Sequence, residues 1–366
     1  MRQIFSILLI LLLSVSYGQN RVAFAKLNKK EDGKYYYKGT LYSGESLILW
    51  PSNNKPMQRV TWRDGQIDGK FRSWYENGEP NQDIGYKMGV RHGSFKTYYL
   101  KGRDDAREVQ CNYKEGTLHG SYAAWYDNGN RKKVATFVDG LEQGDFIIYH
   151  TNGEKEQVGK FKDGKPHGLV TSYDREGTKR KEISYKNGVR DGKTTLYHRS
   201  EEIAETCDYI DGLRDGEKLV YTLEGSLVIK ESYKKGKLDG ESVTFTMNGD
   251  PLEITNYKNG LRDGQYKLYK EQGLDTYGNY KEGKKTGEWV EHKFNEGGPD
   301  IGSYIDGKKN GHWKLGATNI FGKCNGGFKD DLKHGKWEYK RHDGKLKRKK
   351  EQWDNGVLIK SGLFIK

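Results

Sequence analysis

The aromatic and glycine positions of this chain recur at a nearly fixed interval along most of its length. Each copy opens on an aromatic residue, and in all but the last two copies one glycine follows three residues later and a second glycine four residues after that. A strand-like run and an Asn-Gly or Glu-Gly pair follow. The copies begin at Trp62, Tyr86, Tyr113, Phe137, Phe161, Tyr185, Tyr209, Tyr233, Tyr257, Tyr280, Tyr304, Phe328 and Trp353. Between Phe137 and Phe328, seven steps span 24 residues and one spans 23, which indicates a repeat architecture.

One copy shows why each repeat predicts two strands. Residues 69–75 form a short aromatic run that ends at Glu76-Asn77-Gly78, and Asn-Gly pairs accept the positive φ angles of tight hairpin turns. Residues 79–87 return as a second strand, and the segment from Gly89 to Gly93 is expected to link to the next hairpin. No segment has helical spacing. We predict an all-β fold, an elongated single-layer antiparallel array of about thirteen β-hairpin repeats.

The N-terminus predicts export. A short positive start, an apolar run from Ile4 to Leu13 and small residues up to Gly18 follow the order of a secretory signal peptide. The apolar run has about 10 residues, whereas a membrane-spanning helix needs about 20. The mature chain is therefore expected in the periplasm, the outer envelope or outside the cell. The predicted parts are a signal peptide (1–18), an N-terminal segment (19–34) and a repeat array (35–366), with a degenerate first copy (35–61), regular copies (62–352) and a partial last copy (353–366).

Composition fits a thin repeat better than a compact globule. Hydrophobic residues make up 33% of the chain, below the ~45–50% of ordinary domains, while 48 glycines and 13% aromatic residues are present. Disordered chains are poor in aromatics, so disorder does not explain the low hydrophobic content. A regular structure stabilised by packed aromatic rings accounts for both the low hydrophobic content and the high aromatic content.

Cysteines and titratable residues give no sign of a disulfide or a metal site. Successive hairpins should lie about 10 Å apart, which separates Cys111, Cys207 and Cys324 far beyond disulfide reach. The residue before the second glycine of a copy is often histidine or aspartate: His92, His119, His167, His334, Asp68, Asp191, Asp215, Asp239 and Asp263. The same spacing keeps them from sharing an ion. We expect no metal and no cofactor, and predict that these side chains bond to their own turns.

The repeated motif resembles MORN repeats, and more closely their bacterial variant. Residues 257–269, with Tyr-Lys-Asn-Gly followed by a second glycine and paired tyrosines, carry this resemblance, as do residues 113–122. The opening copy around Tyr42-Ser43-Gly44 is similar to proteins called YwqK-type antitoxins. The resemblance implies a scaffold, a membrane-tethering ribbon or an oligomerisation module, and for some members binding of anionic phospholipids. An export signal fits an intracellular antitoxin role less well.

Two aromatic columns are candidates for function. Five residues after the second glycine lie Trp74, Tyr98, Trp125, Tyr149, Tyr173, Tyr197, Tyr221, Phe245 and Tyr269, which we interpret as a stacking ladder, with a ligand platform as the alternative. Two residues after the same glycine, Phe71, Phe95, Tyr122 and Phe146 precede a polar centre of Val170, Thr194, Lys218 and Ser242, followed by Tyr266, Trp289, Trp313 and Trp337. Strand parity puts the two columns on opposite faces. We predict that the eight aromatic residues of the second column form contact surfaces and that its polar centre is solvated.

Charge suggests a second kind of partner. The formal net charge is +13, and most charges alternate in sign along the chain. Local excesses of positive charge predict candidate anion-binding residues: Arg131, Lys132, Lys133, Lys155, Lys179, Arg180, Lys181, Lys345, Lys347, Arg348, Lys349 and Lys350. Such strips favour anionic lipid headgroups or envelope polymers. Export argues against nucleic acid as a partner.

The sequence holds none of the common catalytic or phosphate-binding motifs, and its glycines recur with the repeat. We therefore predict a non-enzymatic, exported binding scaffold that contacts protein partners or a second copy of itself. The alternatives are a peripheral binder of anionic membrane or envelope polymer, and a neutralising partner of a toxin.

Overall fold

The computed structural model describes residues 21–100, 106–271, 273–292, 298–316, 322–340 and 347–365. The predicted signal peptide lies outside the described residues. The chain forms two units. Unit 1 runs to Pro166 and includes Asp174–Gly177, and unit 2 comprises His167–Tyr173 and the chain from Thr178 onward. Among the described residues, no helix has the length and apolar character needed to cross a membrane.

Unit 1 is an open antiparallel sheet of consecutive hairpins, preceded by a small three-stranded sheet. Its elements are β1 (Arg21–Ala23), the 3-10 helix η1 (Phe24–Lys26), β2 (Asn28–Lys29), β3 (Tyr35–Tyr37), β4 (Thr40–Leu41), β5 (Gly44–Leu49), β6 (Pro56–Arg63), β7 (Gln66–Trp74), β8 (Pro80–Lys87), β9 (Val90–Tyr98), β10 (Arg107–Lys114), β11 (Thr117–Trp125), β12 (Arg131–Val138), β13 (Leu141–Glu142), β14 (Gly144–Tyr149), β15 (Lys155–Lys162) and β16 (Lys165–Pro166). Strands from β5 onward pair with their neighbours in chain order.

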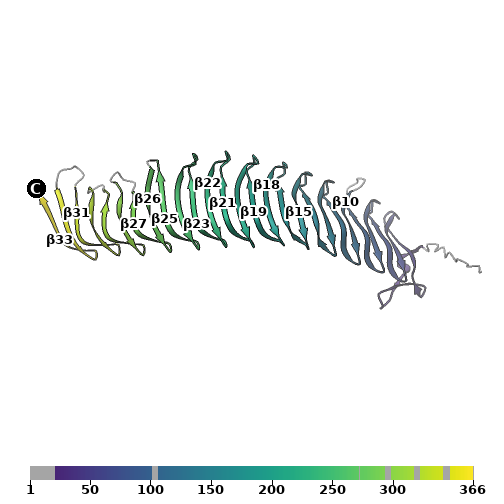
Figure 1. Ribbon diagram of the computed structural model, residues 1–366. Helices are drawn as coiled ribbons and strands as arrows, with labels where there is room; N and C mark the ends of the chain where they lie inside the picture. The colour runs from purple at the N-terminus through teal and green to yellow at the C-terminus, as the bar shows by residue number, and fades with distance from the viewer. Residues whose placement is uncertain are drawn as a thin grey trace, which may run out of the picture. The chain divides into compact units, whose positions relative to one another are not determined.

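Unit 2 repeats the same arrangement, again with each strand antiparallel to the next. Its strands are β17 (Gly168–Tyr173), β18 (Lys179–Lys186), β19 (Val189–Tyr197), β20 (Ile203–Ile210), β21 (Leu213–Tyr221), β22 (Leu227–Lys234), β23 (Lys237–Phe245), β24 (Pro251–Lys258), β25 (Leu261–Lys270), β26 (Gly273–Lys281), β27 (Lys284–Glu291), β28 (Asp300–Ile305), β29 (Lys308–Leu315), β30 (Cys324–Lys329), β31 (Leu332–Tyr339), β32 (Lys347–Asp354) and β33 (Val357–Ile365). Within each unit the hairpins follow one another in a single layer (Figure 1), which confirms the all-β hairpin repeat array.

Two kinds of turn alternate along the sheet. The tight turns have two central residues with positive φ, such as Met88 at 49° and Gly89 at 80°, which is the type I′ geometry that matches strand twist. At the wide turns the chain closes over five residues, and the Tyr75 and Glu79 main chains bond at 2.8 Å. The Asn77 side chain accepts the Glu79 N–H at 3.0 Å. The Asn-Gly pair predicted as a tight turn therefore builds a wide one.

The segment from Gly89 to Gly93 is the end of a tight turn and the start of a strand, contrary to the linker that the sequence suggested. β9 begins at Val90, immediately after the tight turn, and Gly93 lies within it with φ of 78°. The pairing of β8 with β9 shifts register between Ile84 and Tyr86. A glycine with positive φ beside such a bulge lets the ladder resume without strain.

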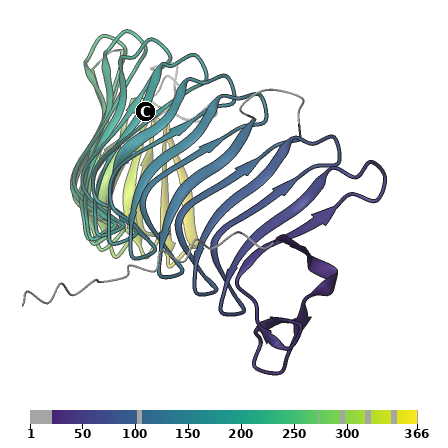
Figure 2. The same cartoon turned by 90° about the vertical axis from the view of Figure 1, so that its right-hand side faces the viewer.

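The N-terminal residues cover the outer edge of unit 1. β1 pairs in parallel with Glu45–Leu47 of β5, and β2–β4 form the small sheet beside it (Figure 2). Leu27, Tyr42, Val60 and Trp62 are buried together at this end. The degenerate first copy thus contributes β3 and β4 to the small sheet, and β5 and most of β6 to the main one.

Candidate binding surfaces

One face of each unit carries two aromatic columns, and we call it the ring face. It holds the aromatic residue that opens each copy and the residue two positions after the second glycine. In unit 1 their rings meet in pairs: Phe71 with Tyr86 at 6.4 Å, Phe95 with Tyr113 at 5.4 Å, Tyr122 with Phe137 at 5.4 Å and Phe146 with Phe161 at 4.5 Å between centroids. Tilted ring pairs of this kind contribute about 0.5–1.5 kcal/mol each beyond area burial.

From Tyr266 to Tyr339 in unit 2 the ring face becomes a core of rings that pack mostly edge-on. Trp289, Trp313 and Trp337 have no exposed surface. Trp313 contacts Tyr304 edge-on at 5.1 Å and Phe328 at 6.0 Å. Each tryptophan lies against a glycine of the preceding strand, and a Cβ at Gly278, Gly302 or Gly326 would come within 2.1–2.2 Å of a ring carbon. The tryptophans therefore fit only because these positions lack side chains.

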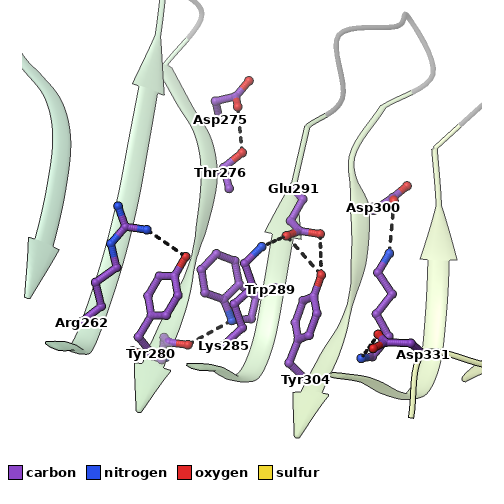
Figure 3. A network of polar contacts seen from close by, with 12 residues as sticks. Arg262, Asp275, Thr276, Tyr280, Lys285, Trp289, Glu291, Asp300, Tyr304 and Asp331 are labelled. Carbon is purple, nitrogen blue, oxygen red and sulfur yellow. Dashed lines mark hydrogen bonds and ion pairs between the residues drawn. The ribbon is translucent and has the colours of Figure 1, made fainter. Parts of the chain in front are cut away.

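A cation lies over the rings of successive copies. In unit 2, Lys285 Nζ is 4.4 Å from the Trp289 centroid and 5.1 Å from that of Tyr304, and Lys309 is 4.2 Å from Trp313. Arg262 Nη1 donates to the Tyr280 hydroxyl at 3.3 Å, and Lys285 forms an ion pair with Glu291 (Figure 3). Cations close to ring faces add attraction and cover the rings from solvent. This column lies five residues after the opening aromatic. It was missed in the sequence because other residues interrupt the lysines and arginines, namely Ile67, Leu118, Glu142, Pro166 and Leu238.

The buried tryptophans correct the prediction that the second column is a contact surface. A side chain without exposed area, as at Trp289, Trp313 and Trp337, cannot meet a partner where it lies, and Phe146 is only 3% exposed. Packing explains all four. A contact role for the half-buried Phe71, Phe95, Tyr122 and Tyr266 stays a prediction.

The polar centre of the same column is packed rather than solvated, which is a second correction. Thr194 is 6% exposed and lies opposite the buried Cys207. Lys218 forms an ion pair with Glu231 at 3.2 Å, and both side chains are largely covered. Where one strand carries a small or polar residue, its neighbour supplies the missing volume or the opposite charge.

Glu351 is the most strongly perturbed acid of the ring face. Burial raises its pKa, but bonds from Lys349 at 2.6 Å, the Tyr339 hydroxyl at 2.6 Å and Trp353 Nε1 at 2.8 Å outweigh burial and hold the pKa at about 2. Burial and the Glu351 carboxylate raise the pKa of Tyr339 in turn. The carboxylate is therefore bound in its charged form.

We expect unit 2 to lose stability as the pH falls from about 4.5 towards 2, because the folded-state pKa of Glu351 lies below its unfolded value. The linked contribution is about 3 kcal/mol above pH 4.5, and it disappears below the folded pKa. Urea unfolding of the parent and of Glu351→Gln at pH 7 and pH 3 measures it. The difference between the two proteins should be largest at pH 7 and less than half as large at pH 3, because the Glu351 carboxyl of the folded protein stays mostly charged down to a pH of about 2.

Glu338→Gln is the matched control, since Glu338 is 44% exposed and pairs only at the surface with Lys350. It should change the free energy of unfolding by less than about 1 kcal/mol. An equal effect of both substitutions at pH 7 would contradict the role given to Glu351.

The first aromatic column lies on the opposite face, where cations and carboxylates contact it. Arg107 lies 4.7 Å from the Trp125 ring centre in unit 1, and Lys179 lies 4.3 Å from Tyr197 in unit 2. The main-chain carbonyls of this column tie successive wide turns together: Tyr75 donates to Tyr98 at 2.8 Å, Tyr99 to Trp125 at 3.0 Å and Tyr126 to Tyr149 at 2.7 Å. These bonds fix the spacing of the repeats.

The histidine and aspartate column bonds to the next copy's turn, not to its own turn as the sequence suggested. Asp215 accepts the Lys235 N–H at 3.0 Å, Asp239 that of Asn259 at 3.0 Å, and His119 Nδ1 that of Asp139 at 3.4 Å. Any acceptor of suitable reach serves, which explains why histidine and aspartate interchange. No group of three or more His, Cys, Asp or Glu that could hold a metal ion occurs within the described ranges.

The predicted anion-binding residues are not equivalent. Arg131, Lys132 and Lys155 are exposed in unit 1, while Lys133 forms an ion pair with Glu142 on the ring face. In unit 2, Lys179 pairs with Glu182 at 3.3 Å, and Arg180 and Lys181 are half-buried. Lys349 and Lys350 bond to Glu351 and Glu338. Lys345 and the side chains of Lys347 and Arg348 lie outside the described residues, and anion binding stays a prediction throughout.

The two fully buried cysteines fill small positions opposite rings or polar residues. Cys111 pairs across the sheet with Tyr122 and Cys207 with Thr194, and each is 2% exposed. Burial raises the pKa of Cys111 to about 11, so its thiol stays protonated and inert at neutral pH. Cys324, at the start of β30, is half-buried.

A row of exposed aliphatic residues follows the tight turns, and the sequence analysis did not single it out. We call the residue directly after each tight turn the turn rim. Its aliphatic members are Val90 (45% exposed) and Leu141 (52%) in unit 1, and Val189 (45%), Leu213 (51%), Leu261 (53%), Leu332 (49%) and Val357 (63%) in unit 2. Exposed lysines such as Lys186 and Lys258 flank the same turns. The signal was available, because these aliphatics alternate with Gln66, Thr117, Lys165 and Lys237 at one repeat position.

Comparison with known proteins identifies the repeat. A family model described as "MORN repeat variant" matches residues 67–88 and 166–187, which supports a MORN-repeat protein. Curated proteins give no match. Crystal structures of TcdB2-TccC3 and of TcdB2-TccC3-Cdc42 align with 86% of this chain at 11% identity, with TM-scores of 0.18 and 0.16. This chain spans 17% and 16% of the length of those chains, and at such TM-scores the likeness carries no argument.

Proposed function

We propose that this chain is an exported, non-enzymatic scaffold whose MORN-type repeats bind protein partners at the cell envelope or outside the cell. The turn rim is the observation that carries the proposal. It presents an exposed aliphatic side chain at one position of five copies in unit 2, and lysine takes that position in the copies between them, at Lys237, Lys284 and Lys308. Exposed apolar residues arranged in a row suit contact with another protein.

The packing of the ring face supports the same proposal. Its rings and cations pack against one another, so the buried rings offer little apolar surface to a partner, whereas the rim side chains are exposed. Repeats stacked with fixed spacing hold the rim residues in a regular row, which lowers the entropic cost of binding. Export rests on the predicted signal peptide.

Affinity capture of the mature chain from the producing cell tests the proposal, with the double variant Leu213→Lys and Leu261→Lys for comparison. Lys237 occupies the same rim position in an intermediate copy, so these substitutions should fold normally. We expect the variant to lose most of any partner that the parent captures. The control is Ser200→Lys at an exposed wide turn.

Equal capture by parent and double variant would remove the rim from the proposal. A toxic protein captured by the parent and released by the double variant would instead favour the neutralising role suggested by the family's antitoxin-like members.

A second candidate function, peripheral binding of an anionic membrane or envelope polymer, is favoured by the exposed lysines beside the rim and by Arg131, Lys132 and Lys155. Pelleting with anionic vesicles at low and high salt separates the two functions. Electrostatic attachment to vesicles should weaken as the salt concentration rises, and it should persist in the double lysine variant. Binding of a protein partner at the rim should instead be lost in that variant.

A further inference from the structure

An open pocket lies on the ring face of unit 1, at the first regular copy. Its volume is about 310 Å³, at the lower end of the range of about 300–1,000 Å³ for small-molecule sites. Apolar side chains supply most of its lining: Phe24, Tyr35, Val60, Trp62, Ile67 and Phe71. Gln58 and Gln66 add amide groups, and among the described residues no charged side chain lines the pocket.

Three of the four aromatic rings at the pocket pack as one group. Phe24 of η1, Tyr35 of β3 and Trp62 of β6 contact one another, with ring centres 4.6–6.2 Å apart. Trp62 is 5% exposed, and its Nε1 donates to the Ser46 hydroxyl at 2.8 Å. Phe71 of β7 lines the pocket beside this group. The aromatic lining is therefore held in place by the fold before any ligand binds.

The equivalent place in several other copies holds a cation of the chain itself. Arg91, five residues after the opening aromatic of its copy, lies 5.3 Å from the Phe95 ring centre and 5.5 Å from that of Tyr113. Arg262 lies over two rings of unit 2 in the same way. Ile67 occupies this repeat position in the first regular copy. The pocket therefore lies where a shorter, uncharged side chain replaces the cation.

The rings at the pocket lack a close cation of their own. In the part of the chain that the structure describes, no lysine or arginine lies over Phe24, Trp62 or Phe71, and the exposed Lys29 is 6.0 Å from the Tyr35 ring centre, at the outer limit of a cation–π contact. Because no carboxylate lines the pocket, a strongly hydrated primary ammonium would lose its water without gaining a partner. A quaternary ammonium has no N–H donor to satisfy and is recognised through aromatic rings.

We propose that this pocket binds a free, small quaternary ammonium compound of the choline type, whose cation takes the role that Arg91 has in the next copy. The amides of Gln58 and Gln66 are placed to meet its hydroxyl or another polar substituent. No lysine or arginine lines the pocket to meet the phosphate that accompanies choline in a lipid, which favours a free compound. The inference is independent of the partner-binding function proposed above.

The test supplies the missing cation from the chain itself. Isothermal titration calorimetry of the whole chain at constant ionic strength should show choline binding at least about tenfold tighter than its uncharged isostere, in which carbon replaces the ammonium nitrogen. Ile67→Arg should fold as the parent does, since Arg91 occupies the same repeat position, and its guanidinium should lie over Phe71. We expect this variant to bind choline at least about tenfold more weakly. Leu118→Arg, at the same repeat position two copies later, is the matched control and should bind choline as the parent does.

A second variant separates recognition of charge from apolar filling. Phe24→Leu keeps the apolar volume of a half-buried side chain but removes its ring, so the preference for choline over the isostere should shrink. Absence of saturable binding up to about 10 mM choline, or equal affinity for choline and the isostere, overturns the proposal. Unchanged choline binding by Ile67→Arg places the site elsewhere. Phosphatidylcholine vesicles that bind the parent but not Ile67→Arg would assign the pocket to a lipid headgroup and overturn the free compound.

Discussion

Gly302→Ala is expected to lower the free energy of unfolding of unit 2 by about 3 kcal/mol, although it adds one methyl group. A Cβ at residue 302 would lie 2.1 Å from Cδ2 and 2.3 Å from Cε2 of Trp313. The ring has no exposed surface and touches Tyr304 and Phe328, so it cannot move aside without displacing both. Overpacking a filled core costs about 1–3 kcal/mol or more. Urea unfolding followed by tryptophan fluorescence measures the change.

The control is Ser303→Ala, the neighbouring residue of β28, which is half-buried. It should stay within about 0.5 kcal/mol of the parent. If Gly302→Ala were equally mild, the packing of Trp313 against the β28 backbone would be wrong, and the glycine would have to be explained by something other than the ring.

The repeat itself was predictable because its turns are determined by the residue types at the turn positions. Positive φ at Asn187 and Gly188, or at Asn259 and Gly260, is what asparagine and glycine adopt at least cost. The aromatic residue before each turn marked the register, so the strands and their antiparallel order followed from a period that the chain keeps closely. The wide turn was mistaken for the tight one because both contain an Asn-Gly or Asp-Gly pair.

The burial of a residue could not be predicted from its own repeat position alone. Trp289 is covered because Gly278 of the preceding strand leaves room for its ring, and Thr194 is covered because it lies between Ile183 and Cys207 of the neighbouring strands. Burial in a single layer therefore depends on the combined volume of positions on neighbouring strands. The glycines two residues before Tyr280, Tyr304 and Phe328 were the available signal, since each coincides with a tryptophan in the following strand.

Trp313→Ala is expected to destabilise unit 2 by about 3–5 kcal/mol, more than Gly302→Ala does. The substitution removes the ring contacts with Tyr304 and Phe328 and the bond from Nε1 to the Ser303 carbonyl at 3.2 Å. It also uncovers Lys309, whose ammonium lies 4.2 Å from the ring centre. Tyr277→Ala, on an opposite-face ring that is 40% exposed, is the control and should cost less than half as much.

The packing space shared by residues 302 and 313 can be filled with the residue types that another copy of the repeat uses at the equivalent positions. In another copy of unit 2, Ile183 occupies the position equivalent to Gly302, and Thr194 occupies the position equivalent to Trp313. These two residues lie opposite each other, so that copy combines a large residue at the first position with a small one at the second. Gly302→Ile alone should be more harmful than Gly302→Ala, because Trp313 remains. Combined with Trp313→Thr, it should recover at least about 2 kcal/mol relative to the sum of the single effects, a coupling within the range for residues in contact. Strict additivity in this double-mutant cycle would mean that the two positions do not share one packing space, and the ring face could not then be a core built by paired volumes.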